Sequence, residues 1–151
     1  MKILLAIDDS KFSEAALQLV IAQSRPEGTQ VRLVHVTEPI TFLFPPEMAS
    51  EYVPTPELAD LRKEQLRKAQ EFLAGAAKKL QVAGFAADTA LFEGDVRTEI
   101  IDIATEWHAD LIVIGSHGRK GLDRFLLGSV SEYVARHAPC SVQIVRLPAK
   151  S

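Results

Sequence analysis

The chain has 151 residues, of which 47% are hydrophobic and 25% charged, and its formal net charge is −3 at pH 7. This length suits a single domain, residues 1–151, built around one hydrophobic core. The slight acidity excludes the basic surface that DNA or RNA binding requires, no apolar stretch is long enough to span a membrane, and a lone cysteine cannot form an intramolecular disulfide. We therefore expect a cytoplasmic protein with no nucleic-acid or membrane partner.

Three short, continuous apolar runs predict strands that helices cover on both faces, as in a parallel sheet. They span residues 3–7, 31–36 and 111–114. A weaker strand is predicted over residues 87–92. The last predicted strand, residues 140–145, alternates polar and apolar side chains and is therefore expected at an edge of the sheet. There it either pairs with another chain or is shielded by the tail that follows it.

Helical patterns separate these strands, over residues 10–24, 55–84, 96–107 and 129–137. The longest begins at Thr55, an N-cap followed by proline. Its charged face, with the string RKEQLRK, is expected to face solvent. Its apolar face is expected to lie on the sheet and comprises Leu58, Leu61, Leu66, Ala69, Phe72, Leu73, Ala76 and Leu80. The alternation of strands and helices predicts an open α/β sheet.

The stretch GSHGRKG, residues 115–121, directly follows a predicted strand and precedes a Gly-Ser pair, residues 128–129, where a helix begins. Ligands of open α/β sheets bind beyond the carboxyl ends of the strands, where Asp8 and Gly115 also lie. Gly115 and Gly118 can supply positive φ and let a ligand approach the backbone, and the helix start offers free amides to an anion. Two interpretations remain, a phosphate site or a glycine loop that only turns the chain.

Several charged or titratable residues are ambiguous in the sequence. His35, inside an apolar strand, is expected to be a hydrogen-bonded core residue. His117 either donates to a phosphate or faces solvent. Arg119 and Lys120 either contact phosphate or form a solvated loop tip.

The spacing G-x2-G-x9-G-[ST], met by Gly115, Gly118, Gly128 and Ser129, resembles the ATP-binding signature of the universal stress protein family. The strings ILLAIDDS, LVHV and GSVSEYVARHAPCSVQIV resemble the family's first strand, second strand, and closing helix and strand. The likeness covers nearly the whole chain. It implies a Rossmann-like fold of the adenine nucleotide alpha hydrolase type, an open sheet of five parallel strands in the order 3-2-1-4-5 with helices on both faces.

The resemblance also implies which residues contact ATP. It places Asp8 at the ribose and phosphates and the backbone of Val36 at the adenine. The full set of implied cofactor contacts is Ala6, Ile7, Asp8, Val36, Ile114, Gly115, Gly118, Arg119, Gly128, Ser129 and Val130. Family members usually form homodimers by antiparallel pairing of the last strand, here residues 140–146.

By this resemblance the chain is an ATP-binding universal stress protein, a nucleotide-dependent stress-response or signalling module, with Mg²⁺ or Mn²⁺ accompanying ATP. Asp8 offers such an ion an oxygen ligand. No catalytic base is identifiable in the sequence, so we do not expect a dedicated enzyme. A slow ATP hydrolase or autophosphorylating enzyme is the alternative, and an interaction protein without nucleotide is a further one.

The segment 37–55, which contains the string FLFPP, has no assigned role in the sequence. It is either a lid over the nucleotide, a surface for a partner, or a loop packed on its own domain. We expect the packed loop, because exposing Phe42, Leu43 and Phe44 to water is unfavourable.

Overall fold

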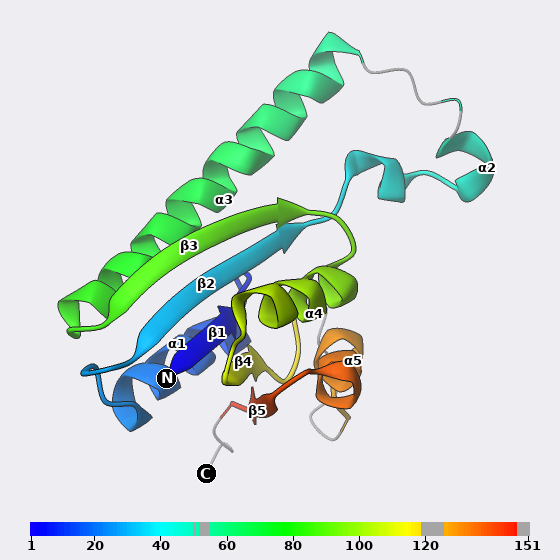
Figure 1. The fold of residues 1–151 in the computed structure, drawn as a ribbon. Helices are drawn as coiled ribbons and strands as arrows, with labels where there is room; N and C mark the ends of the chain where they lie inside the picture. The colour runs from blue at the N-terminus through cyan, green and yellow to red at the C-terminus, as the bar shows by residue number, and fades with distance from the viewer. Residues whose placement is uncertain (50, 52–54, 119–125, 148–151) are drawn as a thin grey trace.

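The apolar runs of the sequence form the centre of a five-stranded parallel sheet in the computed structural model, which describes residues 1–49, 51, 55–118 and 126–147 (Figure 1). The strand order is β3-β2-β1-β4-β5, which confirms the predicted order 3-2-1-4-5. Ile3 of the first strand is paired in register with Val31 on one side and Leu111 on the other. The strands are β1 (Lys2–Ala6), β2 (Gln30–Thr37), β3 (Ala86–Glu93), β4 (Leu111–Gly115) and β5 (Ser141–Val145).

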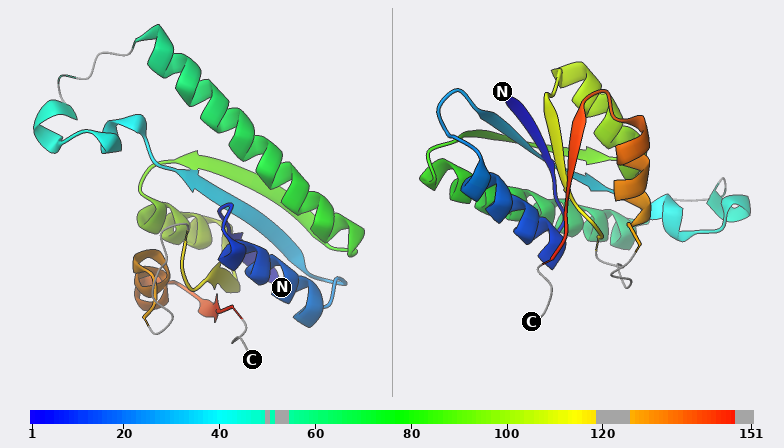
Figure 2. Two further views of the ribbon diagram at one scale, coloured as in Figure 1. Left: turned by 180° about the vertical axis from the view of Figure 1, so that it is seen from behind. Right: turned by 90° about the horizontal axis from the view of Figure 1, so that it is seen from below.

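Helices cover both faces of this sheet, as predicted (Figure 2). Helices α1 and α3 pack on one face and α4 and α5 on the other, and each face has its own cluster of buried apolar side chains. The helices begin where capping residues stand: Ser10, Thr55 and Asp95 each accept a hydrogen bond from a backbone amide of the first turn. The helical elements are α1 (Lys11–Gln23), η1 (Ile40–Leu43), α2 (Pro46–Ala49), α3 (Pro56–Val82), α4 (Val96–Trp107) and α5 (Ser129–His137).

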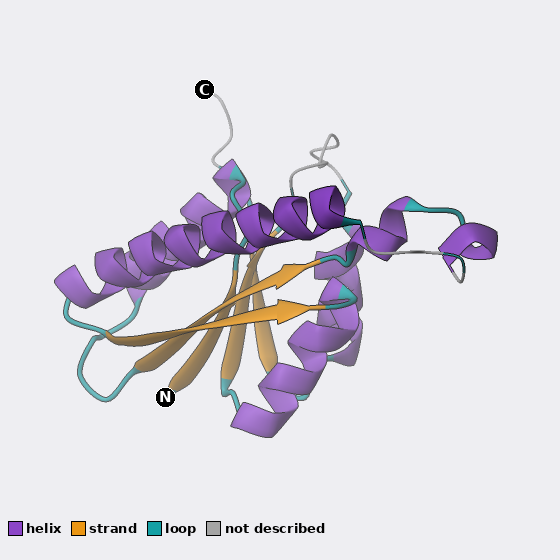
Figure 3. Ribbon diagram, turned by 90° about the horizontal axis from the view of Figure 1, so that it is seen from above, coloured by secondary structure: helices purple, strands orange, loops and turns teal. Residues whose placement is uncertain are grey.

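The long helix α3 runs along one face of the sheet (Figure 3), but its buried residues all lie in its second half. Ala69, Leu73 and Leu80 are buried there, but Leu61, near the other end, is 56% exposed. The prediction that the whole apolar face of this helix lies on the sheet is therefore wrong for Leu61. The helix extends past the ends of its neighbouring strands, so its first turns have no sheet beneath them (Figure 1).

The segment between β2 and α3 contains two short helical elements that the sequence did not predict, η1 and α2. They extend away from the sheet (Figure 1). Phe42 is 55% exposed, so the expectation that this segment packs on its own domain is wrong at that residue. Phe44 is half-buried, and the side chain of Leu43 lies outside the described structure.

No helix within the described ranges is both long and apolar enough to cross a membrane.

Candidate functional site

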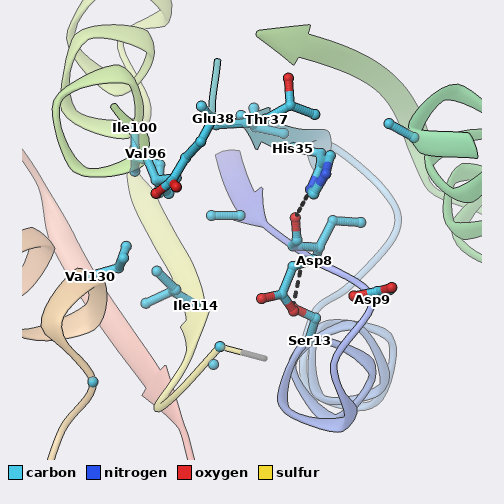
Figure 4. Close-up of a pocket in the computed structure, with 18 of the residues that line it drawn as sticks. Asp8, Asp9, Ser13, His35, Thr37, Glu38, Val96, Ile100, Ile114 and Val130 are labelled. Atoms are coloured by element: carbon cyan, nitrogen blue, oxygen red, sulfur yellow. Dashed lines mark hydrogen bonds between the residues drawn. The ribbon is translucent and has the colours of Figure 1, made fainter. Parts of the chain in front are cut away.

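A cavity of about 760 Å³ opens at the carboxyl end of the sheet, where β1 and β4 lie side by side (Figure 4). The strand order reverses at this point, since β2 follows β1 on one side and β4 lies on the other. The volume of the cavity falls within the range of pockets that hold small molecules and cofactors. Open α/β sheets bind their ligands at this place because the loops that leave the two strands diverge there.

The structure brings nearly all of the candidate nucleotide contacts together around this cavity. Arg119 lies outside the described residues, and so does its neighbour Lys120. The candidates that line the cavity are Ala6, Ile7, Asp8, Val36, Ile114, Gly115, Gly118, Gly128, Ser129 and Val130.

Asp8 is fixed in the cavity wall by the start of helix α1. Its Oδ1 atom accepts hydrogen bonds from the backbone amide of Ser10 and from Oγ of Ser13, both at 2.9 Å. The same Ser13 hydroxyl accepts from the amide of Asp8 at 2.8 Å, so one buried side chain holds both the backbone and the carboxylate of Asp8. The second carboxylate oxygen, Oδ2, lies toward Gly118: a Cβ atom added to that glycine would lie 3.0 Å from it.

The glycines of the site serve close packing rather than positive φ. The expectation that Gly115 and Gly118 supply positive φ is wrong, because among the described residues the positive-φ glycines are Gly28 and Gly84. A Cβ on Gly115 would lie 2.8 Å from Cβ of Phe12, so helix α1 approaches too closely for any side chain. What matters at Gly115 and Gly118 is therefore the absence of a side chain.

Ser116 joins the glycine stretch to the start of helix α5. Its carbonyl oxygen accepts hydrogen bonds from the amide of Gly128 and from Oγ of Ser131, both at 2.8 Å. Ser131 is 2% exposed and donates also to the carbonyl of Gly128 at 3.0 Å. These bonds hold the two separated parts of the G-x2-G-x9-G-[ST] motif against each other.

The first turn of helix α5 is open to an anion. Gly128 is its N-cap residue and makes no side-chain capping bond, and Ser129 at the first helical position is exposed. Backbone amides at such a helix start have no partner within the helix, and the helix dipole adds positive charge there. Gly128, Ser129 and Val130 all line the cavity, so this turn presents its amides to whatever binds.

The histidine of the glycine stretch is packed inward. The ring of His117 lies 5.2 Å from that of Phe12, and its Nδ1 is 3.0 Å from Oγ of Ser116. Its Nε2 is buried with no hydrogen-bond partner among the described residues. The interpretation that His117 faces solvent is therefore wrong.

Helix α3 forms a wall of the cavity that sequence reasoning missed. Gln65, Lys68, Ala69 and Phe72 line it. The charged side chains of RKEQLRK are exposed, as expected, but Lys68 also borders the cavity. Lys68 is next to Ala69 on the apolar face of the helix, and this adjacency is the sequence feature that could have placed Lys68 near the site. The sequence does not say where along a helix of this length the sheet ends, so it could not place the polar neighbours of Ala69 over a ligand site.

The lining carries both signs of charge. Its carboxylates belong to Asp8, Asp9 and Glu38, and Lys68 is the lysine among the described lining residues. The described structure contains no group of three or more His, Cys, Asp or Glu side chains placed to hold a metal ion. The site therefore offers the backbone amides of the first turn of α5, the fixed carboxylate of Asp8 and an apolar wall.

The fold and cavity together define an open α/β protein with a ligand site at the switch point of its sheet. Residues 1–146 match the model of the universal stress protein family, and the chain belongs to that family. It is 33% identical over 149 residues to universal stress protein Sll1388 of Synechocystis, a match that covers 96% of this chain and 97% of the relative.

Solved structures give the same assignment of fold. The structure of hypothetical protein MJ0577 superposes with a TM-score of 0.83 at 29% identity and covers 99% of this chain and 97% of its own. A universal stress protein family protein from Arabidopsis thaliana, solved with AMP bound, gives a TM-score of 0.71 at 19% identity over 99% of this chain and 93% of that chain. A universal stress protein in complex with cAMP gives a TM-score of 0.60 at 23% identity and covers 96% of this chain and 95% of that chain. At these last two identities the likeness shows the fold alone.

Proposed function

We propose that this protein binds ATP in the cavity between β1 and β4 and acts as a nucleotide-dependent stress-response or signalling module. The observation that carries the proposal is the convergence of Asp8, the glycine stretch and the open first turn of α5 on one cavity. These are three separate parts of the chain, and each offers something that a nucleoside polyphosphate needs. A loop that merely turns the chain has no need of that convergence.

In this proposal the phosphates lie at Gly118, Gly128, Ser129 and Val130, where amides and the dipole of α5 stabilise negative charge. The ribose lies by Asp8. The adenine lies between the backbone of Val36 and the apolar wall that Ala69 and Phe72 provide. The AMP and cAMP complexes of the two fold relatives support an adenine nucleotide as the ligand class.

A divalent ion, Mg²⁺ or Mn²⁺, accompanies the polyphosphate in this proposal. The described residues supply no metal cluster of their own. Mg²⁺ is commonly held by one or two carboxylates together with substrate phosphates, and Oδ2 of Asp8 is the carboxylate oxygen that the hydrogen bonds of Ser10 and Ser13 leave available. The ion supplies charge neutralisation, and Asp8 orients it.

We further propose that two copies of the chain pair through the edge strand β5. Among the described residues β5 is paired with β4, and Ser141 at its start is exposed. Edge strands with unpaired backbone groups are sites of strand addition.

Thermal unfolding with and without Mg-ATP tests the proposed ligand. A ligand at 100 times its Kd, bound only to the native state, adds about 2.7 kcal/mol to the free energy of unfolding. For a domain of this size such a gain raises Tm by about 5–10 °C. An unchanged Tm, together with no nucleotide released from the denatured protein, would contradict the proposal.

Two glycine variants make the test specific. Gly118→Val places a side chain against Oδ2 of Asp8 and should abolish the Tm shift. Gly75→Val is the matched control, since Gly75 lies in helix α3 with no atom within 4 Å of an added Cβ. Its Tm shift should equal that of the wild type. Phosphate release above background, lost in Asp8→Ala, would instead indicate an ATP hydrolase.

A further inference from the structure

The hydrogen bond between His35 and Ile7 fixes the proton of the histidine ring. Nδ1 of His35 lies 2.8 Å from the carbonyl oxygen of Ile7. A carbonyl oxygen can only accept, so Nδ1 carries the hydrogen and donates it. A neutral imidazole has one such hydrogen, so in the neutral ring Nε2 is a hydrogen-bond acceptor.

The ring of His35 forms part of the cavity wall beside Phe72. It meets the ring of Phe72 edge to face, with centroids 5.9 Å apart and planes at 72°, and both residues line the cavity. His35 is half-buried, and Nε2 has no hydrogen-bond partner among the described residues. Figure 4 shows His35 on the side of the cavity away from Val130 and helix α5. His35 is thus hydrogen-bonded through Nδ1, as expected, but its second ring nitrogen, Nε2, makes no hydrogen bond to the described residues.

We propose that Nε2 of His35 accepts a hydrogen bond from the exocyclic amine of adenine and so selects adenine over hypoxanthine. This inference rests on the nucleotide-binding function proposed above. The flat base finds apolar surface at Ala69 and Phe72, beside the backbone of Val36, while the phosphates are drawn to the amides of α5. The amine is the hydrogen-bond donor of the adenine base. Hypoxanthine carries a carbonyl oxygen at the same carbon, so two acceptors would face each other.

The selectivity follows from the difference in binding free energy between a nucleotide that makes this hydrogen bond and one that cannot. A site built around a hydrogen bond rejects the analogue that cannot make it, because a polar group is then left without a partner away from water. One such bond corresponds to about a tenfold difference in affinity. We therefore expect the wild type to bind ATP about tenfold more tightly than inosine triphosphate.

Titration calorimetry of His35→Asn with these two nucleotides tests the inference. The shorter amide can still donate to the carbonyl of Ile7, but it places no acceptor where Nε2 stood. ATP should bind about tenfold more weakly, inosine triphosphate should bind nearly as before, and the preference should vanish. His35→Gln, whose side chain reaches the position of Nε2 with an oxygen acceptor, should retain most of the preference.

His137→Asn is the matched control for this substitution. Nδ1 of His137 also lies against a backbone carbonyl, that of Tyr133 at 2.9 Å, and its ring stacks on that of Tyr133 at 4.1 Å. His137 does not line the cavity. This variant should bind both nucleotides as the wild type does.

The outcomes separate this inference from the proposed function. Equal affinity of the wild type for ATP and inosine triphosphate overturns the inference while nucleotide binding stands. The inference also fails if 2′-deoxy-ATP is the weak ligand and His35→Asn removes that difference, because Nε2 then serves the ribose. Failure of the wild type to bind any of the three nucleotides overturns both proposals. Circular dichroism first verifies that each variant is folded. If His35→Asn does not fold, the inference is tested by the ratio of the wild-type affinities for ATP and inosine triphosphate and by the same ratio in His35→Gln.

Discussion

Oγ of Ser131 lies 2.8 Å from the carbonyl oxygen of Ser116 and donates a hydrogen bond to it, although the two residues are separated by the long loop between β4 and α5. Both residues are 2% exposed. The bond fixes the first turn of α5 against the end of β4. The amides proposed to bind phosphate are thereby held in place before any ligand arrives, which lowers the ordering cost of binding.

Ser131→Ala should therefore weaken both the fold and ligand binding. The substitution removes a buried donor that serves two carbonyl oxygens, which corresponds to a loss of about 1 kcal/mol in the free energy of unfolding. Tm should fall by about 2–4 °C in calorimetry. The rise in Tm that Mg-ATP produces should become smaller as well. Ser141→Ala, at an exposed strand position, is the control and should change neither quantity.

Gly115 and Gly75 should respond in opposite ways to the same substitution. Gly115→Ala forces a Cβ to within 2.8 Å of Cβ of Phe12 and 3.0 Å of its backbone carbon, so it should destabilise the protein by about 1–3 kcal/mol. Gly75→Ala meets nothing within 4 Å in a helix interior and should stabilise by about 0.5–1 kcal/mol. Urea unfolding of the two variants measures both changes in the free energy of unfolding. Equal effects would mean that helix α1 does not approach β4 as closely as described.

The sequence predicts the fold well because local and global signals agree. Residues 3–7 and 31–36 are continuous apolar runs in a chain whose helices are capped at Ser10, Thr55 and Asp95, so strands buried on both faces follow directly. The strand order itself came from the family resemblance. Periodicity alone does not specify which strands are neighbours, whereas β1 and β4 are far apart in sequence and adjacent in space.

The site was predictable only where its residues are marked by local features of the sequence. Glycine spacing and the position after a strand identified Gly118 and Asp8, since both features are local in the sequence. Lys68 could not be predicted as a lining residue, because its place depends on how far α3 overhangs the sheet. His35 was predicted as a core residue, and only its hydrogen bond to the carbonyl of Ile7, just after β1, shows which of its nitrogens is left for a ligand.

Pairing through β5 predicts that Val142→Pro yields a monomer. The carbonyl of Val145 faces β4, since it accepts from the amide of Ser116 at 2.8 Å. Backbone groups of alternate residues point to opposite sides of a strand, so the amide of Val142 points to the free edge. Proline removes that amide and leaves the ladder with β4 intact. Light scattering should give twice the chain mass for the wild type and for the control Val142→Ala, and the single chain mass for Val142→Pro. A dimeric proline variant would contradict edge pairing.

Cys140 should react slowly with alkylating agents in the folded protein. Partial burial, and then the negative charge of nearby Asp110, raise the pKa of its thiol above the usual value. The thiolate is the nucleophile, and a higher pKa lowers its fraction at any given pH. Alkylation by iodoacetamide at pH 8, followed by mass spectrometry, should therefore be slower than in the urea-unfolded chain, and it should accelerate only at more alkaline pH.

Replacing the nearby charge tests the cause of this shift. Asp110→Asn keeps an oxygen that can accept from the amide of Lys2, as Oδ2 of Asp110 does at 2.7 Å, but it removes the negative charge. The pKa of Cys140 should fall and alkylation at pH 8 should be faster than in the wild type. Asp102→Asn, on helix α4, is the control and should leave the rate unchanged, since Asp102 does not contribute to the shift at Cys140. Equal rates in wild type and Asp110→Asn would leave burial as the sole cause.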